Sequence, residues 1–65
     1  MIGQHIRSQR VRNGMTQGDL AERLHFKQAT ISMWERGERN PAIEILPQLA
    51  DIFGCSIDSL FGRGV

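Results

Sequence analysis

A short segment near the middle of the chain, residues 28–36, carries small and polar side chains whose chemistry suits contact with the edges of base pairs. In a helix that turns by about 100° per residue, Ile31 and Trp34 fall on one side, and short side chains lie on the other. A glutamine amide can form a pair of hydrogen bonds with adenine, and methyl groups can pack on the methyl group of thymine. This outer side therefore predicts residues that read bases and tolerate A·T-containing half-sites: Gln28, Ala29, Thr30, Ser32 and Met33.

Amides and cations that can bind a phosphate backbone flank the same segment. Gln17 stands in the first turn of another predicted helix, where its amide and the free backbone N–H groups point outward. Arg36, Arg39 and Asn40 follow the end of the segment, where they can meet the other side of a groove. For the two arginines, an ordinary solvated surface with Glu38 nearby is the alternative.

The helix that must position Gln17 is predicted over residues 16–24. Thr16 can accept a hydrogen bond from the backbone N–H three residues on, and Asp19 stands where a capping-box acid reaches back. Leu20 and Leu24 recur at helical spacing and give one short apolar face. A helix this short needs support from the rest of the fold.

Only His25, Phe26 and Lys27 separate this helix from the segment 28–36, so we expect a sharp turn. His25 is the residue expected at positive φ, because histidine tolerates that region better than phenylalanine. Phe26 is then expected to pack inward between the two helices, and Trp34 to join the core. Gly37 is typical of the left-handed residue that closes a helix.

The remaining residues predict three further helices. The pair Asn13-Gly14 ends the first, Pro47 must lie in the first turn of the fourth, and Ser56 is a good N-cap for the last. The predicted fold is all-α, a single domain over residues 1–65 with five helices at about 2–13, 16–24, 28–36, 44–53 and 56–61.

Length and composition allow one small domain without catalytic machinery. The 65 residues are 40% hydrophobic with a net charge of +1, and residues 1–16 carry three arginines and no acid. The chain has no nucleophile paired with a base, no metal-ligand cluster and no phosphate loop, so we expect no enzyme activity, metal or cofactor. Cys55 is expected to be a small buried residue, with a redox or metal switch as the alternative. Because no run of about 18 apolar residues and no signal peptide occurs, we expect a cytoplasmic protein, nucleoid-associated when bound to DNA.

Several motifs between Arg10 and Pro41 occur in a familiar order: RxRNGMTQGDLAERL, TIS, WERG and RNP. With them, residues 2–61 resemble the Cro/phage-repressor helix-turn-helix family, also called Xre-like regulators. The resemblance implies a compact five-helix fold like that of lambda repressor, with the helix-turn-helix formed by helices two and three and double-stranded DNA as the partner.

The resemblance also assigns roles to particular residues. The family's glutamine at the position of Gln17 contacts a phosphate, and Arg10 and Glu35 match a buried ion pair of phage repressors. Lys27 departs from the small hydroxyl residue that often caps the third helix of the family, and we expect it to contact a phosphate instead. The predicted phosphate contacts are thus Gln17, Lys27, Arg36, Arg39 and Asn40.

The last helix is the predicted dimer interface, since its apolar residues exceed what a short terminal helix needs to anchor itself: Ile57, Leu60 and Phe61. A two-fold homodimer, formed at least on DNA, would read half-sites about 34 Å apart. The alternative is that all three side chains pack against the first and fourth helices.

These observations predict a sequence-specific DNA-binding transcriptional regulator, a repressor that occupies an operator with its third helix in the major groove. No small-molecule ligand is expected. A whole Cro-sized protein, a restriction–modification controller, an antitoxin and the DNA-binding end of a longer regulator remain open. A helical protein-interaction module is the alternative of a different class, and the short polar side chains of the third helix speak against it.

Overall fold

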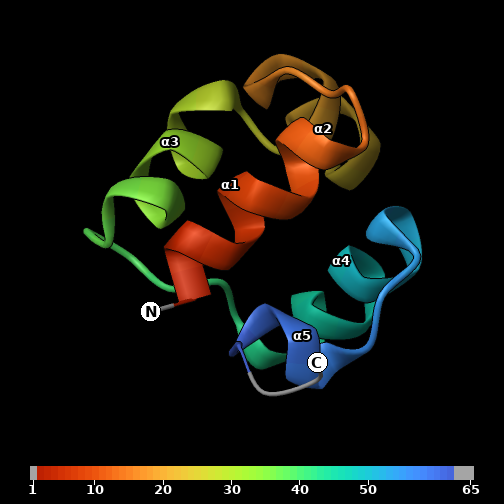
Figure 1. Cartoon of the computed structure of the whole chain (residues 1–65). Coiled ribbons are helices and arrows are strands. Elements are labelled where there is room, and N and C mark those ends of the chain that lie inside the picture. The colour runs from red at the N-terminus through yellow and green to blue at the C-terminus, as the bar shows by residue number, and fades with distance from the viewer. Residues whose placement is uncertain (1, 63–65) are drawn as a thin grey trace.

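The computed structural model describes residues 2–62, and every regular element within them is a helix (Figure 1). The elements are α1 (Ile2–Arg12), α2 (Gln17–Leu24), α3 (Gln28–Arg36), the 3-10 helix η1 (Ile43–Ile45), α4 (Leu46–Phe53) and α5 (Ile57–Leu60). The predicted all-α, five-helix fold is confirmed. Within the same residues, no helix is long and apolar enough to cross a membrane.

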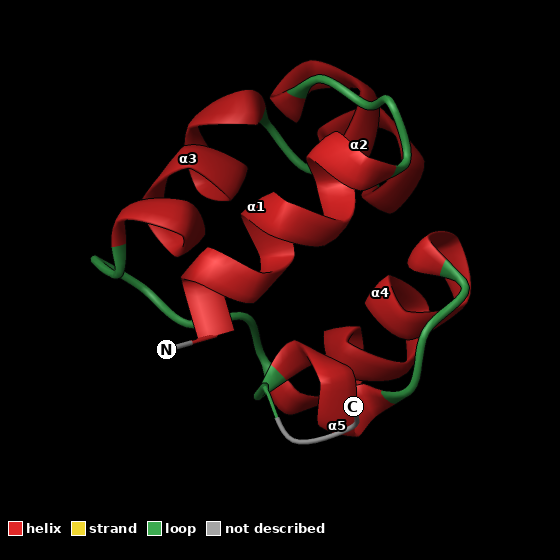
Figure 2. Ribbon diagram, viewed as in Figure 1, coloured by secondary structure: helices red, strands yellow, loops and turns green. Residues whose placement is uncertain are grey.

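Helix α1 runs through the middle of the molecule, with α2 and α3 on one side and α4 and α5 on the other (Figure 1). It packs directly against α3 and against α5, while α2 packs on α3 and α4 packs on α5. Short loops join α1 to α2 and α2 to α3 (Figure 2). The helix pair that carries the predicted DNA contacts is therefore fixed by its own tight turn and by α1 behind it.

The boundaries of α2 follow the local signals in its sequence. The Asp19 backbone N–H donates to Thr16 Oγ1 at 3.0 Å, and the Thr16 N–H donates to Asp19 Oδ2 at 2.9 Å, so the predicted capping box forms. His25 ends the helix at φ 61°, in the left-handed region, as predicted. Phe26 packs edge-on against Trp34, with ring centroids 5.6 Å apart, but its side chain stays partly exposed.

Helix ends differ from the prediction where a cap or a proline intervenes. Residues 43–45 form the 3-10 turn η1, and the α-helix starts at Leu46 with Pro47 in its first turn, whereas we predicted one helix from 44. In a regular α-helix, a proline ring clashes with the carbonyl group of the residue four positions before it. The residues just before Pro47 therefore do not form a regular α-turn. At the other end, α5 spans only Ile57–Leu60, because Ser56 is its N-cap and Phe61 its C-cap.

The core lies between α1 and the other helices. It is built from one or more apolar side chains of each α-helix: Ile6, Leu20, Ala21, Leu24, Ile31, Trp34, Leu46, Leu49, Phe53 and Leu60. The prediction that Trp34 belongs to the core holds. The prediction for Leu60 is wrong, because its side chain is 0% exposed and so belongs to the core of the single chain and not to a surface for a partner.

Helices α1 and α3 approach each other closely at Gly3. A Cβ atom at this position would overlap the Trp34 carbonyl oxygen and lie 3.1 Å from the carbonyl carbon and 3.2 Å from Glu35 Cα. Only a glycine therefore permits this crossing without a shift of one helix. The crossing brings α1 alongside the end of α3 that carries Glu35.

Cys55 lies just after α4, half-buried and packed against the core. Burial raises the pKa of its thiol, since a thiolate would lose hydration there. No group of three or more potential metal-ligating side chains occurs in the described part of the chain.

Candidate nucleic-acid interface

The two sides of α3 differ in burial as its helical phase predicts. Ile31 and Trp34 are buried against α1 and α2, whereas Gln28 and Ala29 are exposed. The other predicted base-reading residues, Thr30, Ser32 and Met33, are half-buried. Gln28 and Ala29 therefore form the most accessible part of this surface, at the N-terminal end of the helix.

Lys27 starts α3 without a side-chain cap. Its backbone is extended, with φ −91° and ψ 152°, and its carbonyl accepts from the Thr30 N–H at 3.0 Å. A lysine has no acceptor to offer the first-turn N–H groups, so it leaves this positive end of the helix open toward an anion. The exposed ammonium of Lys27 adds to the positive charge there.

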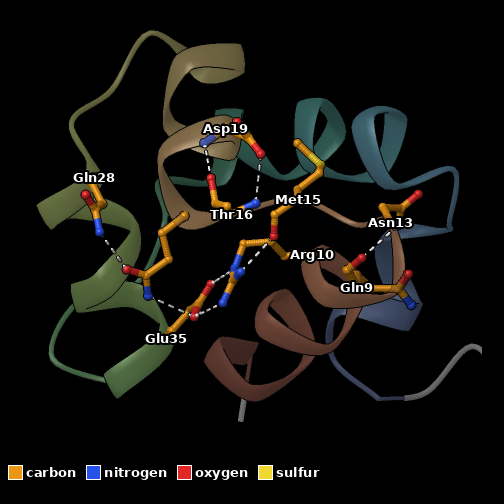
Figure 3. Close-up of polar contacts among 9 residues, drawn as sticks. Gln9, Arg10, Asn13, Met15, Thr16, Asp19, Gln28 and Glu35 are labelled. Carbon is orange, nitrogen blue, oxygen red and sulfur yellow. Dashed lines mark hydrogen bonds and ion pairs between the residues drawn. The ribbon is translucent and has the colours of Figure 1, made fainter.

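An ion pair behind the interface joins α1 to α3 (Figure 3). Arg10 Nε lies 2.7 Å from Glu35 Oε2 and Arg10 Nη2 lies 3.0 Å from Glu35 Oε1, and the two side chains are only 11% and 5% exposed. The remaining arm of the fork, Nη1, donates to the Met15 carbonyl at 2.8 Å. The pair implied by the family resemblance is thus present, and it also holds the turn before α2, a contact that sequence reasoning missed.

The pair holds both groups in their charged forms. Burial raises the pKa of Glu35, but the hydrogen bonds from Arg10 and Gln17 and the positive charges of Arg10 and Arg7 together bring it below its ordinary value. The hydrogen bond to Glu35 raises the pKa of Arg10 above its ordinary value, with burial opposing it. Glu35 is therefore a carboxylate near neutral pH and can only accept hydrogen bonds.

Gln17 is oriented differently from its prediction. The sequence led us to expect an amide directed outward, but the side chain is half-buried and its Nε2 donates to Glu35 Oε1 at 3.1 Å. Its Oε1 accepts from Gln28 Nε2 at 3.3 Å. Both ends of the Gln17 amide are therefore engaged within the protein, with one N–H left for a phosphate. The helical phase predicted that Glu35 lies on the side of α3 that faces α1. It did not predict the hydrogen bond that Glu35 accepts from Gln17 of α2.

The predicted phosphate contacts after α3 are exposed. Arg36 pairs with Glu38 at 2.8 Å, with both side chains more than half exposed (58% and 56%). A phosphate would have to replace Glu38 as the partner of Arg36, which costs little because such exposed pairs contribute only about 0–1 kcal/mol. Arg39 and Asn40 are exposed as well, beside this pair.

The predicted dimer residues divide into two groups. Ile57 and Phe61 are 40% and 49% exposed, whereas Leu60 is buried, as described above. The exposed apolar surface of α5 is therefore formed by its first residue and its C-cap.

Comparison with known proteins adds independent evidence on the family of this chain. The family model described as "Helix-turn-helix" matches residues 6–60. An HTH-type transcriptional regulator of Archaeoglobus fulgidus is 36% identical over 56 residues, which cover 86% of this chain and 80% of that protein. The competence pilus inhibition repressor of Acinetobacter baylyi is 38% identical over 60 residues, or 92% of this chain and 54% of the repressor.

A third relative, the HTH-type transcriptional regulator ImmR of Bacillus subtilis, is 31% identical over 62 residues, which cover 95% of this chain and 49% of ImmR. The chain thus spans most of the Archaeoglobus protein but only about half the length of the other two. No solved structure matches the chain significantly.

Proposed function

We propose that this chain, which belongs to the Xre-like helix-turn-helix family of transcriptional regulators, binds operator DNA sequence-specifically and represses transcription by occupying it. The members of this family are regulators and not enzymes. One observation carries the proposal: α3 buries its apolar side and leaves Gln28 and Ala29 exposed at its N-terminal end. The protein would act in the cytoplasm, on the nucleoid when bound to DNA.

In the proposed complex α3 lies in the major groove. The groove is about 12 Å wide and a helix with its side chains is about 10–12 Å across, so the outer side of α3 fits against the base edges. Gln28, Ala29, Thr30, Ser32 and Met33 would contact bases. Phosphates on either side would be held by Gln17, Lys27, Arg36, Arg39 and Asn40, which fix the register of the protein on the duplex.

Repression is the proposed outcome of binding. The Acinetobacter relative is described as a repressor, and a bound protein of this size can block access to the DNA that it covers. We further propose that a second copy binds through Ile57 and Phe61, and that the two α3 helices read half-sites one helical turn apart on the DNA, about 34 Å. Such a dimer would read a two-fold symmetric operator.

Selection of bound sequences from random duplexes tests this function most directly. We expect selected DNA to contain symmetric half-sites, to bind at least about 10³-fold more tightly than random duplex, and to lose affinity steeply as salt rises. A gel-shift titration at two salt concentrations gives both quantities. If no sequence is preferred over random duplex, the proposal is wrong, and the exposed side of α3 is to be tested as a surface for a protein partner.

A further inference from the structure

A series of hydrogen bonds runs from the buried ion pair to the exposed end of α3. Arg10 donates to Glu35 at 2.7 and 3.0 Å, Gln17 donates to Glu35 at 3.1 Å, and Gln28 donates to Gln17 at 3.3 Å. Figure 3 shows the two ends of this series, with Gln28 on α3 at one end and Arg10 beside Glu35 at the other. The series therefore connects α1, α2 and α3 through four side chains.

The direction of every bond in this series is fixed by Glu35. A carboxylate has acceptors only, so the Gln17 group that faces it must be the NH₂. The carbonyl oxygen of the Gln17 amide then faces the other way and can only accept, which requires the NH₂ of Gln28 on that side. A neutral amide at position 35 would permit either orientation of Gln17, and hence either orientation of Gln28.

The orientation of the Gln28 amide matters for base recognition. With one N–H on Gln17, Gln28 retains a second N–H and a carbonyl oxygen, which match the N7 acceptor and the N6 donor of adenine. Guanine presents two acceptors at the same places, so the Gln28 oxygen would face guanine O6 without a hydrogen between them. Holding the amide before binding also reduces the side-chain entropy lost on contact.

We propose that Glu35 is a positioning residue for base recognition: through Gln17 it holds the Gln28 amide in the orientation that favours adenine over guanine. This inference rests on the proposed function, in which Gln28 contacts a base. It assigns Glu35 a second role beside its pairing with Arg10, at a residue that is itself only 5% exposed.

The first test removes the carboxylate without stranding a charge. In the double variant Arg10→Met, Glu35→Met both charges are replaced by apolar side chains, an exchange that is often neutral for stability. We expect the ratio of affinities for duplexes with adenine or guanine at the Gln28 contact to fall about three- to tenfold, part of the full discrimination of a glutamine–adenine pair. Glu38→Gln, a charge change at the exposed neighbour of Arg36, is the control and should leave the ratio unchanged.

The second test leaves the ion pair intact. Gln17→Met keeps the length of the side chain and removes both of its hydrogen bonds, so we expect the same fall in the adenine-to-guanine ratio. Loss of a phosphate contact alone would instead weaken binding to both duplexes by the same factor, with the ratio unchanged, and that result would overturn the inference. If the double variant does not fold, as judged by circular dichroism, Gln17→Met decides.

A cycle with Gln28→Ala separates positioning from general damage to the fold. In the Gln28→Ala background, Gln17→Met should no longer alter the adenine-to-guanine ratio, because no amide remains to be oriented. An equal change in both backgrounds would contradict the inference. If the wild type binds selectively but Gln17→Met has the same adenine-to-guanine ratio, only this inference is wrong. If the wild type prefers no sequence, the proposed function itself is wrong.

Discussion

At the level of single residues, Glu35 links stability to the proposed base-reading surface. Its carboxylate is bound by Arg10 and Gln17 and has almost no contact with water. Separating such a buried charge from its partner is costly, because the other charge remains in the interior without compensation. A substitution at this residue should therefore first lower the stability of the folded protein.

We predict that Glu35→Ala lowers the free energy of unfolding by about 3–5 kcal/mol. The whole stability of a small domain is only about 5–15 kcal/mol, so the variant should be close to unfolded at 37 °C. Urea denaturation followed by circular dichroism measures the difference. Glu38→Ala, whose pair with Arg36 is exposed, should lose less than about 1 kcal/mol; similar losses in both variants would show that the Arg10 pair is not specially stabilising.

Gln28 and Arg39 are expected to differ in the kind of binding they contribute. Gln28→Ala should cost about 1–3 kcal/mol of binding free energy and relax the base preference at one position of the site. Arg39→Ala should weaken binding to all duplexes by the same factor and reduce the slope of log affinity against log salt concentration by about one phosphate contact. Titration of a selected duplex and its single-base variants at several salt concentrations separates the two effects. An unchanged base choice in Gln28→Ala would show that α3 is placed wrongly in the proposed complex.

At the level of the elements, features that depend on nearby residues could be predicted from the sequence, whereas features that depend on tertiary contacts could not. The capping box at Thr16 and the positive φ of His25 could be predicted because each depends on neighbours a few residues away. The inward orientation of Gln17 and the burial of Leu60 could not, since the first depends on a carboxylate of another helix and the second on how α5 lies against α1. The split of the predicted helix 44–53 into η1 and α4 reflects the geometry around Pro47.

Alanine substitutions at two glycines should have opposite effects on stability, because Gly3 lies at the crossing of α1 and α3 and Gly18 lies on the exposed side of α2. Gly3→Ala should destabilise the protein by about 1–3 kcal/mol, because the added methyl group would meet the Trp34 carbonyl and push the helices apart. Gly18→Ala should stabilise it by about 0.5–1 kcal/mol, since a Cβ atom there meets only Thr16 Oγ1 at 3.7 Å on the exposed side of α2. Thermal denaturation of the two variants beside the wild type measures both.

A destabilised Gly18→Ala would contradict the helical account of α2, and a neutral Gly3→Ala would show that α1 and α3 can separate without loss. The second outcome would also weaken the role given to the crossing, which is to hold Arg10 against Glu35. The two variants therefore test the support of the interface independently of DNA.

At the level of the whole molecule, two acids predict a loss of stability at low pH. Burial raises the pKa of Glu35, but Arg10 and Gln17 bring it below the ordinary 4.5, and hydrogen bonds from the Thr16 backbone and hydroxyl lower that of Asp19 below the ordinary 3.8. The folded state thus binds fewer protons than the unfolded state, so stability rises with pH. The contribution is complete above the ordinary pKa values and is lost as the pH falls through the lower folded values.

We therefore expect the urea midpoint to stay level from about pH 7 to 5 and to fall progressively below about pH 4.5. The double variant Arg10→Met, Glu35→Met should show a shallower fall, because only Asp19 of the two acids remains. Equal slopes in the two proteins would contradict the assignment of acid sensitivity to Glu35.

The oligomeric state is the last property that α5 predicts. Ile57 and Phe61 lie exposed at its two ends, and burying them against a second copy would remove apolar surface from water at about 25 cal/mol per Å². Sedimentation at increasing concentration, with and without selected DNA, should show dimers for the wild type.

Phe61→Glu should stay monomeric over the same concentrations without loss of thermal stability, because Phe61 is 49% exposed and follows the last helix. Ile43→Glu, at an exposed apolar residue of η1, is the matched control and should dimerise like the wild type. Since only a dimer can read two half-sites, Phe61→Glu should also bind a symmetric operator with little more affinity than a single half-site. Wild-type protein that remains monomeric even on such DNA would exclude α5 as a dimer interface and leave each copy to bind its half-site alone.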